Sequence, residues 1–578
     1  MSSIAPDAPA SGSAAAPTQS SPPPPTQAQL MAIFAARAKN DHDAMILYAA
    51  VLAALIGLFT IVHIFVYLWR KSSLAQVSAT VPPPFNYSES IKRLLLRKVP
   101  GAPSLGHALL YITYLGLNVG LVFVYTDDSI LPLHVIVAAR TGWLAIANLC
   151  LTVFLSLKIT PLGFLVGWTY ERLNPFHRVS GLMTFILVLV HAASYSSFFL
   201  EQQNAARLRV LDEIFGIVAG FTLFTVVAVA LTLQRRRYEL FYVLHVLFFI
   251  ASLVFICLHH PTAAERVIIP ISVAAGIWFF DRLARASRLV YHGVNNSATL
   301  QPLASGGTRV IMRKNLSGAR SGQHAFLWIP GVRLFESHPF TIVNTQPLEF
   351  LIEARDGFTR DLHDYAVKNS GVTLKASVEG PYGQIPEPAL YDKILIFAGG
   401  SGATFGIGIA LQLLKDLGNI IKRDITVVWV MRNPDLLEWF SFHIEHLARA
   451  QGFKVLIHIT DQIELSKIVF SDQAAPATRD SPEGTLVSEG QLGTTLTDDT
   501  PSQSDAQRGF MYATPIHFGR PQVDDIVAQT IEGMPASSRV LVLGCGPPSL
   551  LQDMRQSTTS RMTPNGAGIS LQFEQFGW

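Results

Sequence analysis

Seven long apolar segments constrain the fold of this chain more than any other feature of its sequence. Each is close to the roughly 20 residues that a helix needs to cross about 30 Å of hydrocarbon. Hydrophobic residues make up 49% of the 578 residues and charged residues only 15%, a composition that excludes a purely soluble protein. We therefore predict a polytopic α-helical membrane domain of seven helices, with spans at 44–69, 105–126, 136–157, 178–199, 208–233, 239–260 and 267–283.

Net charge and cysteine content exclude two other classes of protein. The 44 Lys and Arg residues against 41 Asp and Glu leave a formal charge of +3, which is too small and too dispersed to indicate a nucleic-acid partner. Cys150, Cys257 and Cys545 lie far apart in the sequence, and two of them lie inside apolar runs. A disulfide framework and a CxxC metal site are therefore both excluded.

Basic residues indicate the orientation of the spans, because Lys and Arg in short flanking loops stay on the cytoplasmic side. The pattern predicts an N-terminus outside and everything after about residue 284 in the cytoplasm. Residues 1–43 are rich in Ala, Ser and Pro and lack the features of a signal peptide, so we predict a disordered tail. The basic clusters follow the first, third, fifth and seventh spans and include Arg70, Lys71, Lys158, Arg172, Arg178, Arg235, Arg236, Arg237, Arg282, Arg285 and Arg288.

The hydrophobic pattern changes after residue 290 to short β-branched runs, and then to strands alternating with helices. This order predicts a small β-barrel followed by an α/β nucleotide fold. A stretch dominated by Ser, Thr, Asp, Gly and Pro at 471–508 is predicted to be a disordered insertion. The predicted divisions are the tail 1–43, the first two membrane helices 44–135, the remaining membrane domain 136–289, the β-barrel 290–389 and the α/β domain 390–578.

Four histidines share one spacing in the fourth and sixth spans. His177 and His191 are fourteen residues apart, and so are His245 and His259. Fourteen helical steps return to within about 40° of the starting face and separate the side chains by roughly 21 Å. Because the two spans run in the same direction, His177 is predicted to lie level with His245, and His191 with His259. Two stacked bis-imidazole sites result, as two b-type haems require.

A structural explanation competes for each histidine taken alone, namely a hydrogen bond between helices. Two pairs with the same spacing on parallel helices favour ligation instead, because ionisable side chains in lipid are uncommon and usually functional. His260 faces about 100° away from His259 and is not chosen. His63 and His107 lack partners of this kind and are interpreted as structural. Arg140 has two open interpretations, pairing with a haem propionate or snorkelling to the headgroups.

Glycine-rich turns in the C-terminal half suggest a nucleotide site. A buried strand at 394–398 leads into Gly399, Gly400, Ser401, Gly402, Ala403 and Thr404 and then into a helix. This geometry lets backbone amides and a helix N-terminus hold a pyrophosphate, although tight packing also selects such turns. A later strand at 540–543 leads into Gly544, Cys545, Gly546 and Pro547, which places a thiol where ligands bind in open α/β sheets. A buried cysteine can also be a small hydrophobe.

Further motifs precede and follow these turns in a fixed order. They are His338, Pro339, Phe340, Thr341 and Ile342, then Gly357, Phe358, Thr359 and Arg360, then Glu379, Gly380, Pro381, Tyr382 and Gly383, and finally Phe573, Glu574, Gln575, Phe576, Gly577 and Trp578. Together, from about residue 136 to 578, the motifs resemble the ferric reductase and NADPH oxidase superfamily, specifically the fungal ferric and cupric reductases. The resemblance implies a bis-haem helix bundle followed by a ferredoxin-reductase-like module, with an FAD-binding β-barrel and an NADPH-binding α/β domain.

The resemblance also implies roles for residues. The pairs His177/His245 and His191/His259 match the inner and outer haem ligands. Residues His338, Pro339, Phe340, Thr341 and Ile342 match the flavin-ring motif, and Gly357, Phe358 and Thr359 the flavin-phosphate turn. Residues Gly399, Gly400, Ser401, Gly402 and Thr404 match the NADPH pyrophosphate loop, Arg432 and Arg520 the adenosine-phosphate end, and Gly544, Cys545, Gly546 and Pro547 the nicotinamide side. Trp578 matches the aromatic residue that covers the flavin.

Two departures from the family pattern accompany these matches. Gly408 stands where the family usually has proline after the glycine loop. The position at which the following helix begins is therefore left open. The tail is shorter than in many fungal members, so a dedicated outer metal-binding domain is expected to be missing or reduced.

The resemblance implies a transmembrane NADPH-dependent ferric-chelate reductase. Electrons would pass from cytoplasmic NADPH through FAD and two b-type haems to Fe(III) or Cu(II) complexes outside, in support of iron uptake. The chain would lie in membrane lipid, with the plasma membrane as the default and a vacuolar membrane as the alternative, and an iron-uptake oxidase or permease would be its partner. We expect Cys545 and Trp578 to position the reacting groups.

Two alternatives remain open at this stage. A superoxide-generating NADPH oxidase would use the same wiring, with dioxygen as acceptor. A metal-binding membrane transporter or receptor would show no haem spectrum and would leave the glycine loops and Trp578 without a common purpose.

Overall fold

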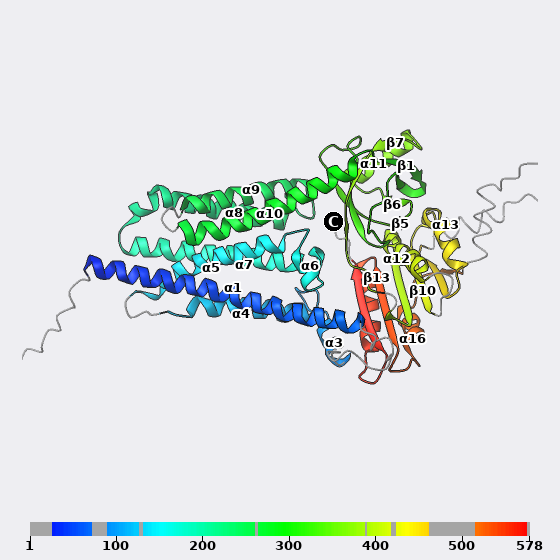
Figure 1. Ribbon diagram of the computed structural model, residues 1–578, viewed down its shortest axis with the longest axis horizontal. Helices are drawn as coiled ribbons and strands as arrows, with labels where there is room; N and C mark the ends of the chain where they lie inside the picture. Colours follow the sequence, from blue (N-terminus) through cyan, green and yellow to red (C-terminus); the bar gives the residue numbers. More distant parts are fainter. Residues whose placement is uncertain are drawn as a thin grey trace, which may run out of the picture.

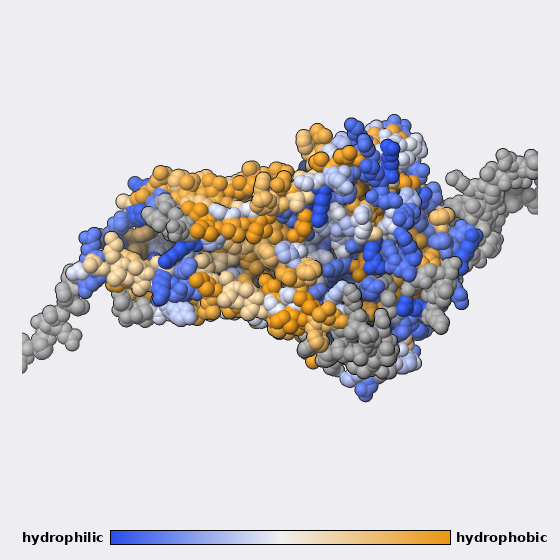
Figure 2. Space-filling view, in the orientation of Figure 1, coloured by the Kyte–Doolittle hydropathy of each residue, from blue (hydrophilic) through white to orange (hydrophobic). Residues whose placement is uncertain are grey.

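The computed structural model describes residues 26–71, 89–126, 131–259, 264–387, 390–417, 423–461 and 515–574. Long helices form one half of the molecule, and three sheets with their helices form the other half (Figure 1). Apolar side chains cover the outside of the helical half, whereas polar side chains cover most of the sheet-containing half (Figure 2). The contrast is that of a membrane bundle joined to a water-facing module.

Seven helices of the described chain are long and apolar enough to span a membrane, as predicted. Their bounds are α1 Gln27–Lys71, α4 Leu105–Phe123, α5 Leu133–Leu155, α7 Tyr170–Glu201, α8 Leu211–Thr232, α9 Tyr238–His259 and α10 Ala264–Gly293. Shorter helices connect them: α3 Glu89–Leu96, α6 Pro161–Leu165 and η1 Ala205–Arg209.

Two predicted boundaries in this region are wrong. Helix α1 begins at Gln27, so residues 27–43 are helical and do not belong to a disordered tail; residues 1–25 lie outside the described part. The charged residues Arg37 and Asp41 lower the hydropathy of this stretch, but both face partners in the bundle. Helix α10 passes the predicted end at 283 and continues to Gly293, directly before the first strand of the barrel.

A buried ion pair attaches the N-terminal half of α1 to α5. Arg140 Nε donates to Asp41 Oδ1 at 2.7 Å, and both side chains are only 1% exposed. The same guanidinium donates from Nη1 to the carbonyl oxygens of Leu121 and Val124, at 2.8 and 2.5 Å. Arg140 therefore follows neither sequence interpretation, because it neither snorkels nor turns toward the histidines. It joins α1, α4 and α5 instead.

Amide and phenol groups continue this attachment one layer deeper. Tyr48 of α1 donates its hydroxyl to Asn148 Oδ1 of α5 at 2.8 Å, and Asn148 Nδ2 donates to Asn118 Oδ1 of α4 at 2.6 Å. All three side chains are buried. Hydrogen bonds of this kind fix the register of helices for which lipid supplies no hydrophobic driving force.

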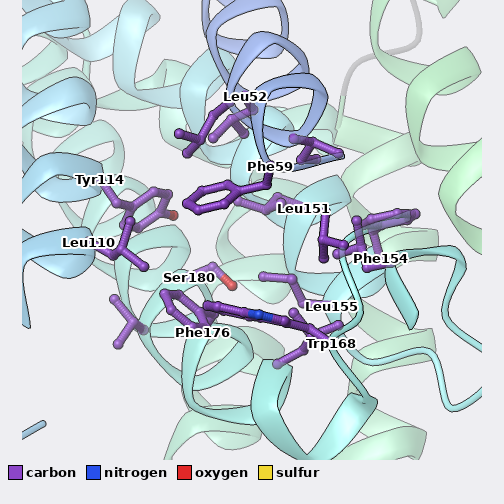
Figure 3. Close-up of a pocket in the computed structure, with 16 residues that line it drawn as sticks. Leu52, Phe59, Leu110, Tyr114, Leu151, Phe154, Leu155, Trp168, Phe176 and Ser180 are labelled. Carbon is purple, nitrogen blue, oxygen red and sulfur yellow. The ribbon is translucent and has the colours of Figure 1, made fainter. Parts of the chain in front are cut away.

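The other half of α1 packs less closely. An apolar pocket of about 160 Å³ lies between α1, α4, α5 and α7, with Leu52 and Phe59 of α1 facing Trp168 and Phe176 (Figure 3). Trp168 stands on the connection between α6 and α7 and packs beside Phe176 at a centroid distance of 5.8 Å. The polar contacts of the N-terminal half, rather than continuous packing, therefore determine where α1 lies.

The sheet-containing half has the two parts that the sequence predicts. The barrel combines a five-stranded sheet in the order β5-β6-β2-β1-β7 with a three-stranded sheet in the order β4-β3-β8. Its elements are β1 Ser297–Leu303, η2 Ala304–Gly306, β2 Gly307–Met312, β3 His324–Trp328, β4 His338–Thr341, β5 Asn344–Thr345, β6 Leu348–Glu353, α11 Phe358–Lys368, β7 Thr373–Lys375 and β8 Ser377–Tyr382.

The α/β domain is a six-stranded parallel sheet in the order β12-β11-β10-β9-β13-β14. The chain runs outward from β9 in one direction and then returns to the other side of β9, so the order reverses between β9 and β13. Its elements are β9 Lys393–Gly399, η4 Gly400–Gly402, α12 Ala403–Leu417, β10 Asp424–Met431, α13 Leu436–Ala448, β11 Phe453–Ile459, β12 Ile516–Phe518, α16 Val523–Ile531, β13 Arg539–Cys545, α17 Pro548–Ser560 and β14 Gly568–Glu574. The predicted insertion 471–508 lies outside the described residues.

We predict that Asp41→Ala lowers the thermal unfolding midpoint of the detergent-solubilised protein. The substitution leaves the Arg140 guanidinium buried without its carboxylate, and breaking a buried pair costs about 3–5 kcal/mol. Asp43→Ala is the matched control, since the Asp43 side chain is 45% exposed. The midpoints are measured by fluorescence-detected size-exclusion chromatography after heating. Equal midpoints for the two variants would show that the ion pair does not hold α1 in place.

Candidate functional site: histidine pairs and nucleotide loops

The four histidines meet in two pairs across the bundle. The ring centroids of His177 and His245 are 6.4 Å apart, and those of His191 and His259 are 6.3 Å apart. A metal–imidazole bond is about 2 Å long and the ring centroid lies about 1 Å further out, so two rings on opposite sides of one metal ion have centroids about 6 Å apart. Both pairs therefore have the spacing of bis-imidazole ligation.

Backbone carbonyls orient all four rings. Each Nδ1 lies within hydrogen-bond distance of one carbonyl oxygen: His177 to Thr152 at 2.9 Å, His191 to Ala138 at 2.7 Å, His245 to Val226 at 3.2 Å and His259 to Asp212 at 2.8 Å. Because a carbonyl oxygen only accepts, Nδ1 must carry the hydrogen in each ring. In a neutral imidazole this leaves the Nε2 lone pair for a metal. The donor chemistry thus fits two haem irons.

Small residues make room for the pair of His191 and His259. A Cβ at Gly142 would come within 2.7 Å of His191 Nδ1, and a Cβ at Gly216 within 2.6 Å of the His259 ring. A cavity of about 760 Å³ adjoins both imidazoles between α5, α7, α8 and α9. A cavity of this size, bounded by two oriented imidazoles, fits a large planar cofactor.

The other membrane histidines take the structural positions that the sequence favoured. His107 lies within 2.9 Å of Ser104 Oγ and stacks beside Phe176 at 5.8 Å. His63 packs against Gly167, where an added Cβ would come within 2.8 Å of the ring. His260 lies outside the described residues.

The predicted flavin motifs converge on one edge of the barrel. His338 opens β4 and stacks on Phe358 at the start of α11, with centroids 4.9 Å apart and planes 25° apart. Gly357 precedes that helix with φ of 56°, a conformation that favours glycine. Thr359 lies in the same turn, where its hydroxyl accepts from the backbone of Arg355 and donates to that of Asp356. Pro339 and Phe340 follow His338 on β4.

Some members of these motifs are buried in the barrel. Ile342 is 0% and Phe358 is 1% exposed, so these two side chains shape the site through packing. Thr341 is also buried, at the end of β4.

The two glycine turns lie side by side at the carboxyl ends of β9 and β13, where the strand order reverses. A Cβ at Gly402 would come within 2.6 Å of the Cys545 carbonyl oxygen, and one at Gly399 within 2.5 Å of Pro547. This edge of an open α/β sheet is where nucleotides bind. The turn containing Gly400 and Ser401 leads into α12 at Ala403, where Thr404 donates its hydroxyl to the Ser401 carbonyl at 3.0 Å.

Gly408 does not displace the start of this helix. Helix α12 begins at Ala403 and runs through Gly408 to Leu417. A Cβ at position 408 would come within 3.0 Å of the Gly322 nitrogen and 3.1 Å of the Ile342 carbonyl oxygen. Glycine therefore lets α12 pack closely against the barrel.

The remaining nucleotide-site residues lie at the same edge of the sheet. Arg432 directly follows β10, and Arg520 follows β12 after one residue; both are exposed. Gly544, Cys545 and Gly546 form the end of β13 and its turn. Trp578 lies outside the described residues.

Burial makes Cys545 a neutral thiol. The residue is 3% exposed, and desolvation, with a smaller contribution from Glu574, raises the pKa of its thiol to about 12. A thiol that stays protonated is a poor nucleophile. Cys545 is therefore suited to positioning a ligand rather than to covalent chemistry.

A polar junction that the sequence analysis missed joins the bundle to the barrel. The Lys158 ammonium lies 3.9 Å from the ring centroid of Tyr170 and 4.6 Å from that of Phe326. His324 Nε2 lies 3.2 Å from both the Tyr170 hydroxyl and a carboxylate oxygen of Glu171. Burial lowers the pKa of Lys158 to about 7 and that of His324 to about 3.

An ion pair strengthens the same junction. Arg285 of α10 donates from Nη2 to Glu379 Oε2 of β8 at 3.0 Å, and Tyr382 donates its hydroxyl to the same carboxylate. Arg285 and Glu379 are 94 positions apart, so no local spacing could have revealed this ion pair. Helices α7 and α10 thereby hold strands β3 and β8 at one end of the bundle.

Comparison with known proteins identifies three modules in this order. A model described as a ferric reductase like transmembrane component matches residues 141–256, an FAD-binding domain matches 294–386 and a ferric reductase NAD binding domain matches 391–559. The chain resembles the fungal ferric and cupric reductases. It therefore carries a membrane component, an FAD-binding domain and an NAD-binding domain, as the sequence predicted.

Curated relatives extend the similarity to most of the chain. Ferric reductase transmembrane component 4 of Saccharomyces cerevisiae is 27% identical over 530 residues, which cover 85% of this chain and 70% of that protein. Ferric/cupric reductase transmembrane component 2 of the same yeast is 26% identical, with 85% and 68% covered. Ferric/cupric reductase transmembrane component 1 of Candida albicans is 24% identical, with 74% and 55% covered.

We predict that Gly402→Ala weakens binding of NAD(P)H. The added Cβ must push the two turns apart, and overpacking of this kind costs about 1–3 kcal/mol, so KM for the nucleotide should rise about tenfold. Oxidation of the nucleotide by a soluble dye gives the measurement. Gly568→Ala is the control because its nearest neighbour lies 3.8 Å away. An unchanged KM would show that the two turns do not take part in nucleotide binding.

The position of Glu574 at the end of β14 leads us to predict that the stability of the protein depends on pH. Burial, with a smaller contribution from Glu171, raises the pKa of Glu574 from 4.5 to about 7, so the folded protein binds this proton more tightly than the unfolded chain. Its contribution is complete below pH 4.5 and is lost as the pH rises to about 7. Glu574→Gln should therefore raise the unfolding midpoint at pH 8 and leave it unchanged near pH 4.5. The exposed Glu438→Gln should change neither midpoint.

Proposed function

We propose that this chain is a transmembrane ferric-chelate reductase that moves electrons from cytoplasmic NADPH, through FAD and two b-type haems, to Fe(III) or Cu(II) complexes outside. One observation carries the proposal: two imidazole pairs with the spacing of bis-imidazole ligation are stacked in a bundle whose far end joins a nucleotide-binding module. The names of the yeast and Candida relatives supply the metal substrate.

The residues of this chain would bind and position the cofactors. The cofactors supply the redox chemistry, since FAD converts the two-electron hydride of NADPH into single electrons that haem iron accepts. His177 and His245 would hold the inner haem, and His191 and His259 the outer one, each through Nε2. The motif of His338 and the turn of Gly357 would bind FAD, while the turns at Gly399 and Cys545 would bind NADPH.

The position of the module supports an orientation of the chain in the membrane. The N-terminal end of α1 lies at the end of the bundle away from the barrel (Figure 1). With the basic loops on the cytoplasmic side, the N-terminus lies outside and the module lies inside. Moving one negative charge outward is then favoured by about 2.3 kcal/mol per 100 mV of inside-negative potential. We place the chain in the plasma membrane, where an iron-uptake oxidase or permease would use the reduced metal.

His259→Ala tests this wiring. We expect the variant to lose one of two haems per chain in a pyridine haemochrome assay, and to lose Fe(III) reduction in reconstituted vesicles. NADPH oxidation by a soluble dye should continue, because the nucleotide and flavin sites lie in the module. His63→Ala should keep both haems, since this ring packs against Gly167 and is not paired with an imidazole. Two haems in His259→Ala, or fewer than two in the unaltered protein, would refute the proposal.

A further inference from the structure

Helix α1 lies outside the segment that matches the ferric reductase membrane component, yet it contributes to the cavity beside the outer histidine pair. Arg37 of α1 lines this cavity together with His191 and His259. Its side chain is 20% exposed. One helical turn later, Asp41 is fixed to Arg140, so the buried ion pair sets the height at which Arg37 enters the cavity.

Tyr195 directs the Arg37 guanidinium toward the outer histidine. Arg37 Nη2 donates to the Tyr195 hydroxyl at 2.6 Å, and the Tyr195 ring lies beside the His191 ring with centroids 5.1 Å apart. Tyr195 stands one turn after His191 on α7. The guanidinium is therefore held about one helical turn beyond His191, which we assign as a ligand of the outer haem.

The charges around the cavity leave Arg37 able to accept an anion. Arg207 also lines the cavity, but it lies 2.9 Å from Asp212 and 3.1 Å from Glu213. Arg37 Nε lies 3.9 Å from Asp41 Oδ2, which is too far for a hydrogen bond. That carboxylate already accepts from Arg140 at 2.7 Å. A guanidinium has five N–H donors, and the phenol of Tyr195 engages only part of this fork.

We propose that Arg37, positioned by Tyr195, forms a carboxylate-binding site at the outer end of this cavity. Guanidinium groups bind carboxylates with two parallel hydrogen bonds, which gives both attraction and orientation. Two sources supply this chemistry: the carboxylates of an anionic Fe(III) chelate, or a propionate of the outer haem. This inference rests on the proposed reductase function and names a ligand class for its outer site.

Arg37→Gln in the purified full-length protein distinguishes the two sources. If the site binds the substrate, KM for Fe(III) citrate should rise about tenfold, while KM for the neutral tris-maltol Fe(III) complex stays unchanged. If the site binds a propionate, a spectroelectrochemical titration should show a lower midpoint potential for one haem, because a negative charge loses its counter-charge. Arg37→Lys keeps the charge but loses the fork, so it should restore part of either effect.

Two further variants control for general electrostatics and test the positioning role of Tyr195. Arg209→Gln removes the same charge from an exposed residue of η1, which is not among the residues lining the cavity, and should change neither quantity. Tyr195→Phe removes the positioning hydroxyl and should reproduce a weaker form of the Arg37→Gln effect.

Each outcome decides one question. Unchanged KM values together with unchanged potentials in Arg37→Gln would overturn the inference, as would equal effects of Arg37→Gln and Arg209→Gln. Absence of haem or of Fe(III) reduction in the unaltered protein would instead refute the proposed function. The two failures are therefore distinguishable.

Discussion

Four hydrogen bonds from imidazole Nδ1 atoms to backbone carbonyls determine how the membrane half is arranged. The carbonyls that hold His177 and His191 of α7 belong to α5, and those that hold His245 and His259 of α9 belong to α8. Each histidine-bearing helix is thus paired with a neighbour that sets its ring orientation. The two helix pairs face each other across the imidazoles. In lipid, where an unsatisfied polar group is costly, this arrangement gives each ring one defined tautomer.

The parts of this structure that follow from periodicity could be predicted from sequence. The fourteen-residue spacing of the histidines depends only on helix geometry, and the glycine turns after β9 and β13 follow from strand and turn chemistry. The start of α1 could not be predicted from hydropathy, because Arg37 and Asp41 have partners on other helices. Their spacing with Tyr48, at four and then seven residues, does place all three on one face, and this was the signal that could have identified the longer helix.

The junction around Lys158 and His324 depends entirely on tertiary structure. It brings the start of α7 against β3, which pairs with the strand carrying His338. Arg285 makes a second attachment to β8. The module is thus bound at two points to the bundle, once at α7, which bears two of the histidines, and once at α10. It therefore has little freedom to change its distance from the histidines. Apart from Glu379 and Tyr382, which belong to a motif with no assigned cofactor, the residues that fix this distance lie outside every motif that the sequence analysis named.

The ion pair between Asp41 and Arg140 also affects how the chain is assembled during synthesis. The two residues are 99 positions apart, so α1 leaves the ribosome long before its buried partner exists. Until α5 is made, the Asp41 carboxylate in the N-terminal part of α1 lacks this partner, and an unpaired charge in lipid is costly. The N-terminal part of α1 can therefore reach its final place only after α5 arrives, so the order in which the ribosome delivers the helices is not the order in which their contacts form.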